Sequence, residues 1–193
     1  MDALSQSSGW FRAAGIAALA LFAAATLWIN YQVKVNVQGG GGGGGAVHEM
    51  GNVKLGGPAP DFSVQDLSNR LVSLATYRGQ KVVLLDFWAT WCGPCRLEMV
   101  DLQTLQDNFK SMGFEILSLN QRESADQVRQ FIQRKQYRFH VLLDDGTVSA
   151  KYGVRAIPTL VLVGKDGTVQ WLQVGYGKDD AELKNKIQGL VKQ

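Results

Sequence analysis

Residues 82–95, VVLLDFWATWCGPC, decide the fold. The apolar run Val82–Trp88 predicts a buried strand, because a parallel strand covered on both faces reads as continuously apolar. Apolar residues then recur at helical spacing, at Met99, Leu102, Leu105 and Phe109. The sequence therefore predicts a strand, a short turn, a cysteine pair and a helix.

The two cysteines of the chain, Cys92 and Cys95, are separated by two residues in this segment. The reactive form of a cysteine is its thiolate, and a free thiol has a pKa of about 8.5. At a helix start, unsatisfied N–H groups and the positive end of the helix dipole lower that pKa. Cys95 lies one turn further along the same face. We predict that Cys92 attacks a partner disulfide and that Cys95 resolves the mixed disulfide.

Two other uses of the cysteine pair are weaker. A structural disulfide across two residues would close a very small loop and stabilise little. A zinc site needs about four ligands, and beyond the pair the chain offers only His48 and His140 as further histidine or cysteine ligands. The strand before the pair and the helix after it favour redox chemistry, with the disulfide itself as redox group and no separate cofactor or metal.

The segment Asp86–Arg96 resembles the active-site segment of the thioredoxin superfamily. The stretch from Ala59-Pro60-Asp61-Phe62 to Leu85 resembles the N-terminal extension of its membrane-anchored TlpA/ResA-type branch, and the resemblance covers roughly residues 59 to 191. It implies an α/β thioredoxin fold, in which a central mixed sheet has helices on both faces, with an N-terminal β-hairpin extension. Alternating apolar residues between 62 and 74 fit that hairpin, and a hairpin turn is expected at 165–167.

The N-terminal part of the chain predicts a membrane anchor at residues 1–32. Residues 13–29 are apolar except for Thr26, and as a helix they would be about 25 Å long, near the lower limit for a bilayer span. A cleaved signal peptide remains possible, because Ala23-Ala24-Ala25 offers a cleavage site, and so does a buried helix of the soluble domain. The first two alternatives both place the domain outside the cytoplasm.

The remaining chain divides into a linker and one domain. Gly39–Gly45 is an uninterrupted glycine run, which predicts a flexible linker over residues 33–57 and a thioredoxin-like domain over 58–193. The charge balance of 20 Lys and Arg against 17 Asp and Glu gives only +3. That excess is too small and too scattered to indicate nucleic-acid binding.

Asp86 interrupts the apolar strand. An unpaired buried carboxylate is costly, so its pKa should be raised. Asp86 matches the buried aspartate of thioredoxins, which lies beneath the second cysteine and exchanges a proton with it. The alternative is that the strand ends early and Asp86 is solvated.

Glu98 follows Cys95 by one helical turn and matches an active-site glutamate of ResA-type proteins. Alternatively it is an exposed residue of the first turn, favoured by the helix dipole. The chain departs from that branch at Asp86, where asparagine is usual, and at Val100, where both families usually have proline.

The resemblance also indicates which residues would contact a substrate. In the family, the proline that matches Pro158 is cis, lies against the cysteine pair and presents backbone for a substrate to pair with, which makes Ile157 and Pro158 candidates. An ordinary trans proline opening a strand is the alternative. Trp91 would be an exposed contact for partner chains, and Gly93 and Pro94 lie between the sulfurs.

The Gly-Pro pair between the cysteines resembles that of reducing thioredoxins, which favours a reductase over an oxidant. The TlpA/ResA resemblance implies that the reductase acts on disulfides in exported proteins. The TlpA/ResA resemblance implies apocytochrome c as the leading candidate substrate and a membrane thiol carrier of the DsbD/CcdA kind as electron donor. One alternative is a peroxiredoxin-type thiol peroxidase, although Leu85 and Ala89 occupy the positions where those enzymes carry proline and threonine or serine. A tethered, non-catalytic binding module is the other.

Overall fold

The computed structural model describes residues 45–177 and 181–193. The predicted membrane segment and all but the last residue of the glycine run lie outside the described residues. Among the helices of the described part, none combines the length and the apolar character that a membrane crossing requires.

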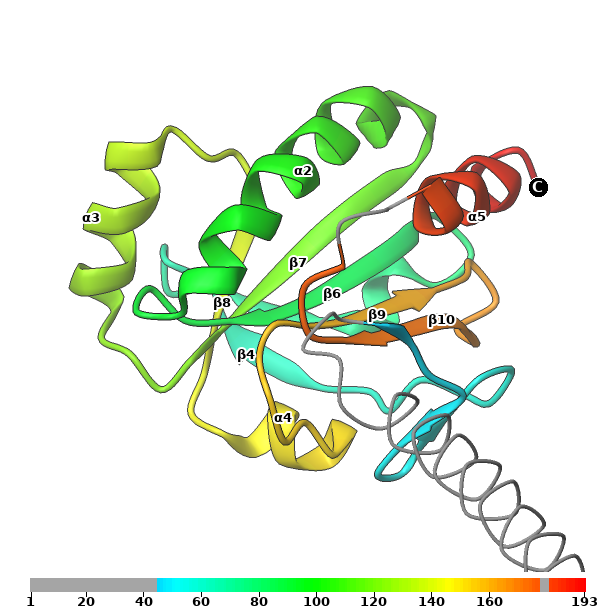
Figure 1. The fold of residues 1–193 in the computed structure, drawn as a ribbon, viewed down its shortest axis with the longest axis horizontal. Coiled ribbons are helices and arrows are strands. Elements are labelled where there is room, and N and C mark those ends of the chain that lie inside the picture. The colour runs from blue at the N-terminus through cyan, green and yellow to red at the C-terminus, as the bar shows by residue number, and fades with distance from the viewer. Residues whose placement is uncertain (1–44, 178–180) are drawn as a thin grey trace, which may run out of the picture. The chain divides into compact units, whose positions relative to one another are not determined.

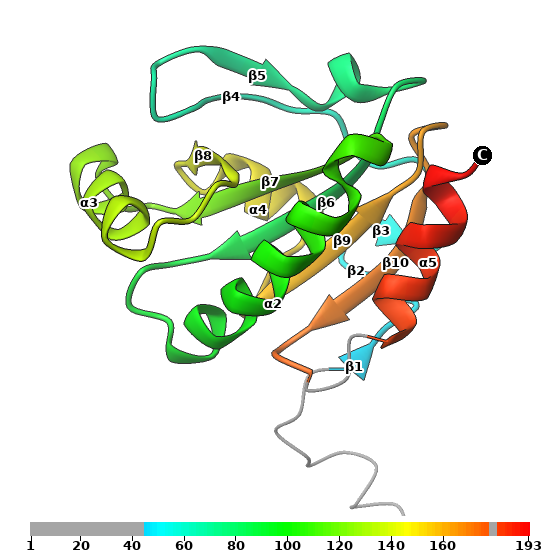
Figure 2. The same ribbon diagram turned by 90° about the horizontal axis from the view of Figure 1, so that it is seen from above.

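A six-stranded mixed sheet forms the centre of the domain, with the strand order β1-β10-β9-β6-β7-β8 (Figures 1 and 2). Strands β6, β7 and β8 are parallel, whereas β9, β10 and β1 join as antiparallel neighbours. The bounds are β1 Gly45–Ala46, β6 Val82–Trp88, β7 Phe114–Gln121, β8 His140–Asp144, β9 Thr159–Val163 and β10 Val169–Val174. This is the predicted thioredoxin fold.

Helices lie on both faces of the sheet (Figure 2). They are α2 Gly93–Phe109, α3 Ala125–Lys135, α4 Thr147–Tyr152 and α5 Ala181–Val191, with 3-10 turns at Leu74–Tyr77 and Lys110–Met112. Alternate residues of β6 enter two separate cores. Leu84 and Trp88 pack in the core that includes residues of α2, α3 and α5, whereas Leu85 and Phe87 pack in the core that includes residues of α4. Two buried faces explain the continuous apolar sequence of β6.

The predicted N-terminal hairpin is confirmed as β4 Ser63–Gln65 paired with β5 Leu71–Ser73. The folded part, however, begins earlier than the predicted boundary at residue 58. β1 pairs with β10, and β2 Glu49–Met50 pairs with β3 Val53–Lys54. Met50 and Val53 are buried in the α4-side core. This corrects the predicted linker at its C-terminal end, where two-residue strands are fixed by packing rather than by local pattern.

The segment after α3 also holds more structure than the sequence predicted. The short apolar run at 141–143 is the centre of β8, an edge strand of the main sheet. Residues 144–146 lead into α4, because the Asp144 carboxylate accepts backbone N–H groups of Gly146, Val148 and Ser149 at 2.8–3.0 Å. Capping of this kind satisfies the free N–H groups at a helix start.

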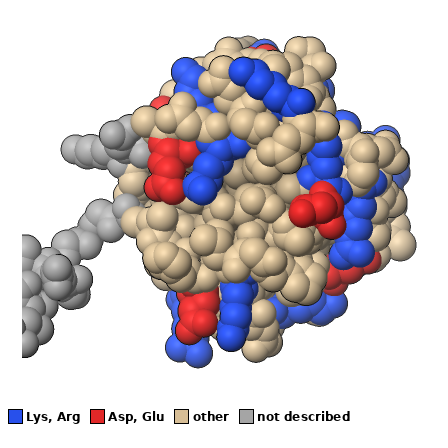
Figure 3. Space-filling model, turned by 90° about the vertical axis from the view of Figure 1, so that its right-hand side faces the viewer, with Lys and Arg blue, Asp and Glu red and all other residues tan. Residues whose placement is uncertain are grey.

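Charged side chains of both signs lie close together on the surface. Figure 3 shows one face on which Lys and Arg alternate with Asp and Glu around an uncharged centre. This distribution matches the small net charge of +3.

Candidate active site

The cysteine pair lies at the junction of β6 and α2. Cys92 caps the start of α2, and its Sγ accepts the backbone N–H of Cys95 at 3.2 Å. The two sulfurs form a disulfide with an S–S distance of 2.01 Å. The predicted position of Cys92 at a helix start is therefore confirmed, and this position favours a thiolate on Cys92 once the disulfide is reduced.

Both cysteine residues are buried beside an exposed tryptophan. Cys92 is 5% exposed and Cys95 is 1% exposed, whereas the neighbouring Trp91 is 69% exposed. Pro94 is exposed and Gly93 is half-buried. Trp91 and Pro94 are therefore the exposed residues beside the disulfide, and Cys92 is slightly more exposed than Cys95.

The Ile157–Pro158 peptide bond is cis, as the resemblance implied. The carbonyl oxygen of Ile157 lies 3.8 Å from Cys92 Sγ. Pro158 is buried at the start of β9, while Ile157 is half-buried. The alternative of an ordinary trans proline is wrong, and the segment before β9 lies directly beside the reactive sulfur.

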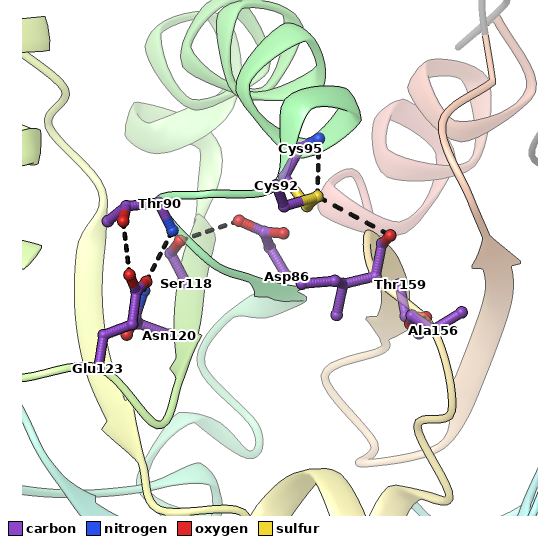
Figure 4. Close-up of a disulfide and its surroundings, with 10 residues drawn as sticks. Asp86, Thr90, Cys92, Cys95, Ser118, Asn120, Glu123, Ala156 and Thr159 are labelled. Atoms are coloured by element: carbon purple, nitrogen blue, oxygen red, sulfur yellow. Dashed lines mark hydrogen bonds between the residues drawn. A yellow bond between two sulfur atoms is a disulfide. The ribbon is translucent and has the colours of Figure 1, made fainter.

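Asp86 is buried, with 1% of its surface exposed. Its carboxyl group lies beneath the disulfide, on the same side of the sheet as α2 (Figure 4). The Ser118 hydroxyl donates to Asp86 Oδ2 at 2.9 Å. Burial raises the pKa of Asp86 to about 7, although the hydrogen bond from Ser118 acts to lower it. The alternative of a solvated residue at an early strand end is therefore wrong.

Glu98 is also buried, with 1% exposed, in the stripe of α2 that contains Cys95 and Met99. The alternative of an exposed first-turn residue is wrong. Val100 lies on the opposite, exposed side, and α2 runs continuously from Gly93 to Phe109. Besides Asp86 of β6, the site therefore has a second buried acid, Glu98, which lies one helical turn from Cys95 in α2.

Glu123 is a residue near the site that sequence reasoning missed. Its carboxylate accepts the backbone N–H of Thr90 and the Asn120 side chain, each at 2.7 Å (Figure 4), and the Gln127 side chain at 2.8 Å. The Thr90 hydroxyl donates to it as well. Glu123 therefore fixes the turn just before Cys92 to the end of β7 and the start of α3. From the sequence alone, Glu123 could not be distinguished from any acidic residue that precedes a helix N-cap.

The described residues contain no group of three or more His, Cys, Asp and Glu side chains that could hold a metal ion. His140 lies 3.3 Å from both Asp66 Oδ2 and the Tyr77 hydroxyl. His48 is exposed near the N-terminal end of the folded part.

The comparisons with known proteins agree with this site. Residues 55–172 match the model of the AhpC/TSA family. ResA of Bacillus thuringiensis, named a thiol-disulfide oxidoreductase, is 34% identical over 141 residues, which are 72% of this chain and 78% of that one. The chain belongs to the AhpC/TSA family and is a thiol–disulfide oxidoreductase of the ResA type.

Other relatives support the same assignment. The thioredoxin-like protein YneN of Bacillus subtilis is 36% identical over 64% of this chain and 73% of its own. A Chlorobium tepidum protein described as thiol:disulfide interchange protein DsbE shares 32% identity and a TM-score of 0.67, covering 72% of this ResA-type chain and 99% of that one. A secreted disulfide oxidoreductase of Mycobacterium tuberculosis shares 25% identity and a TM-score of 0.58, covering 67% and 96%.

Proposed function

We propose that this oxidoreductase is a reductase that acts outside the cytoplasm on disulfides of exported proteins, with oxidised apocytochrome c as the leading candidate substrate. The observation that carries the proposal is the position of the cysteine pair: Cys92 caps α2, and the buried carboxyl of Asp86 lies beneath it. A nucleophilic sulfur and a nearby proton acceptor are what dithiol exchange needs.

The reaction begins from the Cys92–Cys95 dithiol. The Cys92 thiolate attacks one sulfur of the substrate disulfide, forming a mixed disulfide, and the other substrate sulfur leaves as a thiolate that takes up a proton. Cys95 then loses its proton and attacks Cys92 Sγ, which releases the second substrate sulfur as a thiol. The substrate gains two electrons and two protons, and the enzyme is left as the disulfide.

Asp86 is proposed to receive the proton of Cys95. A base is effective when its pKa lies close to the working pH, and burial raises the pKa of Asp86 to about 7. Glu98, buried in the same stripe of α2 as Cys95, is proposed as a second acid that influences the two thiols. Two buried carboxyls near two thiols would titrate as a coupled set.

Trp91, Gly93, Pro94, Ile157 and Pro158 are proposed to contact the substrate chain. Trp91, Gly93 and Pro94 adjoin the two cysteines in the chain, and Ile157 places its carbonyl oxygen 3.8 Å from Cys92 Sγ. Backbone groups next to a reactive sulfur can pair with an extended peptide as an added strand does.

The proposed location and electron supply follow from the exported setting. The apolar residues 13–29 and the secreted M. tuberculosis relative support an N-terminal membrane anchor with the catalytic domain outside the cytoplasm. A reductase in an oxidising compartment needs an external source of electrons. We assign that role to a membrane thiol carrier of the DsbD/CcdA kind.

The reduction potential of the Cys92–Cys95 pair tests the direction of the reaction. A reductase should have a value near that of thioredoxin, about −270 mV, measured against a glutathione or dithiothreitol buffer. A value near that of DsbA, about −120 mV, would show that the enzyme oxidises its substrates.

The substrate is best identified by trapping. In Cys95→Ser the mixed disulfide with Cys92 cannot be resolved, so the captured protein can be identified by mass spectrometry. Recovery of an exported protein with a haem-attachment motif supports the proposal, whereas recovery of cytoplasmic proteins alone contradicts the exported setting. Cys92→Ser is the matched control and should capture nothing.

The peroxidase alternative has little support in the site. Leu85 and Ala89 are both buried, and neither supplies a hydroxyl to a peroxide at Cys92. A peroxide-consumption assay with the reduced enzyme tests this alternative. The binding-module alternative would be favoured if Cys92→Ser retained full function in cells.

A further inference from the structure

An open groove of about 410 Å³ lies beside the disulfide. Its lining comprises Trp91, residues 121–123, Ser149 and residues 154–157. Two residues of the lining are neighbours of the reactive cysteine, because Trp91 precedes Cys92 in the chain and the Ile157 carbonyl oxygen lies 3.8 Å from Cys92 Sγ. A peptide whose cystine reaches Cys92 would therefore extend its neighbouring residues into this groove.

Two arginines line the groove, Arg122 and Arg155, and both are exposed. Arg122 has a left-handed backbone conformation with φ of 57°, and its N–H donates to the Asp144 carbonyl at 2.8 Å. Its guanidinium lies against Gly146, where an added Cβ would come within 2.4 Å of Nε. Asp145 is an acidic neighbour that it attracts. The backbone and this packing hold Arg122 in place.

Arg155 has neither a hydrogen bond nor an ion pair with another side chain in residues 45–177 and 181–193. It lies two residues before Ile157, whose carbonyl oxygen is 3.8 Å from Cys92 Sγ, and both residues line the groove. A guanidinium offers several N–H donors in a planar fork that matches a carboxylate. Arg155 is therefore available to a ligand.

The one acid in the groove lining, Glu123, is already occupied. Its carboxylate receives the Thr90 N–H and hydroxyl, the Asn120 amide and the Gln127 amide. Four donors leave little capacity to bind a further cation. The charged groups of the lining that remain for a ligand are the two guanidinium groups, so the electrostatic preference of the groove is for an anion.

We propose that this groove selects substrate segments that carry a carboxylate within a few residues of the reactive cystine, bound by Arg155 and Arg122. The inference deepens the proposed reductase function and rests on it, because it requires a peptide disulfide as the substrate. An acidic residue beside the cystine would form a charge-assisted hydrogen bond at the groove while Cys92 attacks.

Three cyclic peptides test the proposal. Each contains the same Cys-Ala-Ala-Cys disulfide flanked on both sides by Glu, by Gln or by Lys, and the reduced full-length enzyme is mixed with each one in a stopped-flow instrument. At low salt, the second-order rate constant for the Glu peptide should exceed that for the Lys peptide about tenfold, with the Gln peptide between them. The difference should shrink strongly in about 0.5 M salt.

Variants assign the selectivity to the groove. Arg155→Gln and Arg122→Gln together should reduce the Glu-to-Lys ratio to below about twofold while leaving the Gln-peptide rate unchanged. The double variant Arg134→Gln with Lys135→Gln is the matched control, because both residues are exposed in α3 outside the groove lining and their loss also removes two positive charges. It should retain the full ratio.

Equal rates for the Glu and Lys peptides, or a ratio that the double variant leaves intact, would overturn the proposal without affecting the reductase function. Failure of the enzyme to reduce even the Gln peptide would instead contradict the reductase function, and this proposal with it. A higher rate for the Lys peptide would show that the groove prefers cations and would also overturn the proposal.

Discussion

Two aspartates of this domain are almost equally buried but differ in their hydrogen bonds. Asp66, 3% exposed, accepts the backbone N–H groups of Ser68 and Arg70 at 2.7 and 3.0 Å and the Arg70 Nε at 2.9 Å. His140 Nε2 lies 3.3 Å from it. Asp86, 1% exposed, accepts one side-chain hydrogen bond, from Ser118.

The pKa values follow these surroundings. Burial acts to raise the pKa of Asp66, but the bonds from Arg70, Ser68 and His140 hold it at about 2. Burial raises the pKa of Asp86 to about 7, because one hydroxyl does not compensate for lost solvent. Asp66 therefore stays ionised and joins the N-terminal hairpin to β8, while Asp86 can take up and release a proton near neutral pH. The comparison indicates that the hydrogen-bond donors around a buried acid decide its role. Several donors keep Asp66 ionised and structural, whereas a single donor leaves Asp86 able to exchange a proton.

Replacing Asp86 should have the largest effect, on the rate of resolution. In Asp86→Asn, Cys95 loses its proton acceptor, so release of the substrate from the mixed disulfide at pH 7 should slow by about 10²-fold. Single-turnover kinetics with a peptide disulfide measure this step. The loss should diminish above about pH 9, where thiols ionise without help. An unchanged rate at pH 7 would exclude Asp86 as the base.

The raised pKa of Asp86 should also appear in the pH dependence of the free energy of unfolding. The pKa of Asp86 is raised on folding, so the unfolded state releases its proton first as the pH rises from about 4 to about 7. Over that range the free energy of unfolding of the wild-type enzyme should fall relative to that of Asp86→Asn, by up to roughly 4 kcal/mol. Above that range the difference should stay constant. Urea unfolding of both proteins at several pH values measures the difference. A flat difference would contradict a raised pKa.

Replacing Asp66 should give the opposite pattern. Asp66→Asn removes charged hydrogen bonds, so the free energy of unfolding at pH 7 should fall by about 2 kcal/mol, while the exchange rate per folded molecule stays unchanged. Because the pKa of Asp66 is lowered on folding, the wild-type advantage should be present above about pH 4 and disappear as the pH falls through about 2. A slowed thiol–disulfide exchange reaction in Asp66→Asn would contradict the purely structural role assigned to Asp66.

Replacing Glu123 or its partner Gln127 should have the smallest effects on stability. Glu123→Gln keeps one acceptor oxygen but directs an NH₂ group at existing donors, which should cost about 1 kcal/mol and slow exchange only a few-fold. Chemical denaturation and peptide reduction measure the two effects. Gln127→Ala, which removes one exposed donor, should cost less. A larger loss in Gln127→Ala would show that Glu123 is not the centre of this cluster.

Much of the fold could be predicted from the sequence where the local pattern and the packing agree. The apolar run at 82–88 became β6, and the apolar spacing after it became the buried side of α2. The burial of Asp86 followed from the same run. Glu98 lay on the predicted face of α2, but its burial could not be read from its position in the first turns, where acids are also common on the surface.

The parts that could not be predicted depend on contacts between distant segments. β2 and β3 are each two residues long and carry no alternating pattern, and Val53 becomes fully buried only against the completed core. Glu123 reaches Thr90 across 33 positions of sequence. The donors around Asp66 include His140, 74 residues away. Local patterns do not contain such pairings, so both acids looked like ordinary loop residues.

The pKa of the Asp86 carboxyl group, measured by carbon-detected NMR on the oxidised enzyme with labelled aspartate, tests the central claim most directly. Asp86 should titrate near pH 7 while Asp66 titrates below about pH 3, and Ser118→Ala should move the Asp86 value higher. An Asp86 carboxyl that titrates below about pH 5 would contradict the account, because a carboxylate with so low a pKa is too weak a base to take the proton from Cys95 efficiently.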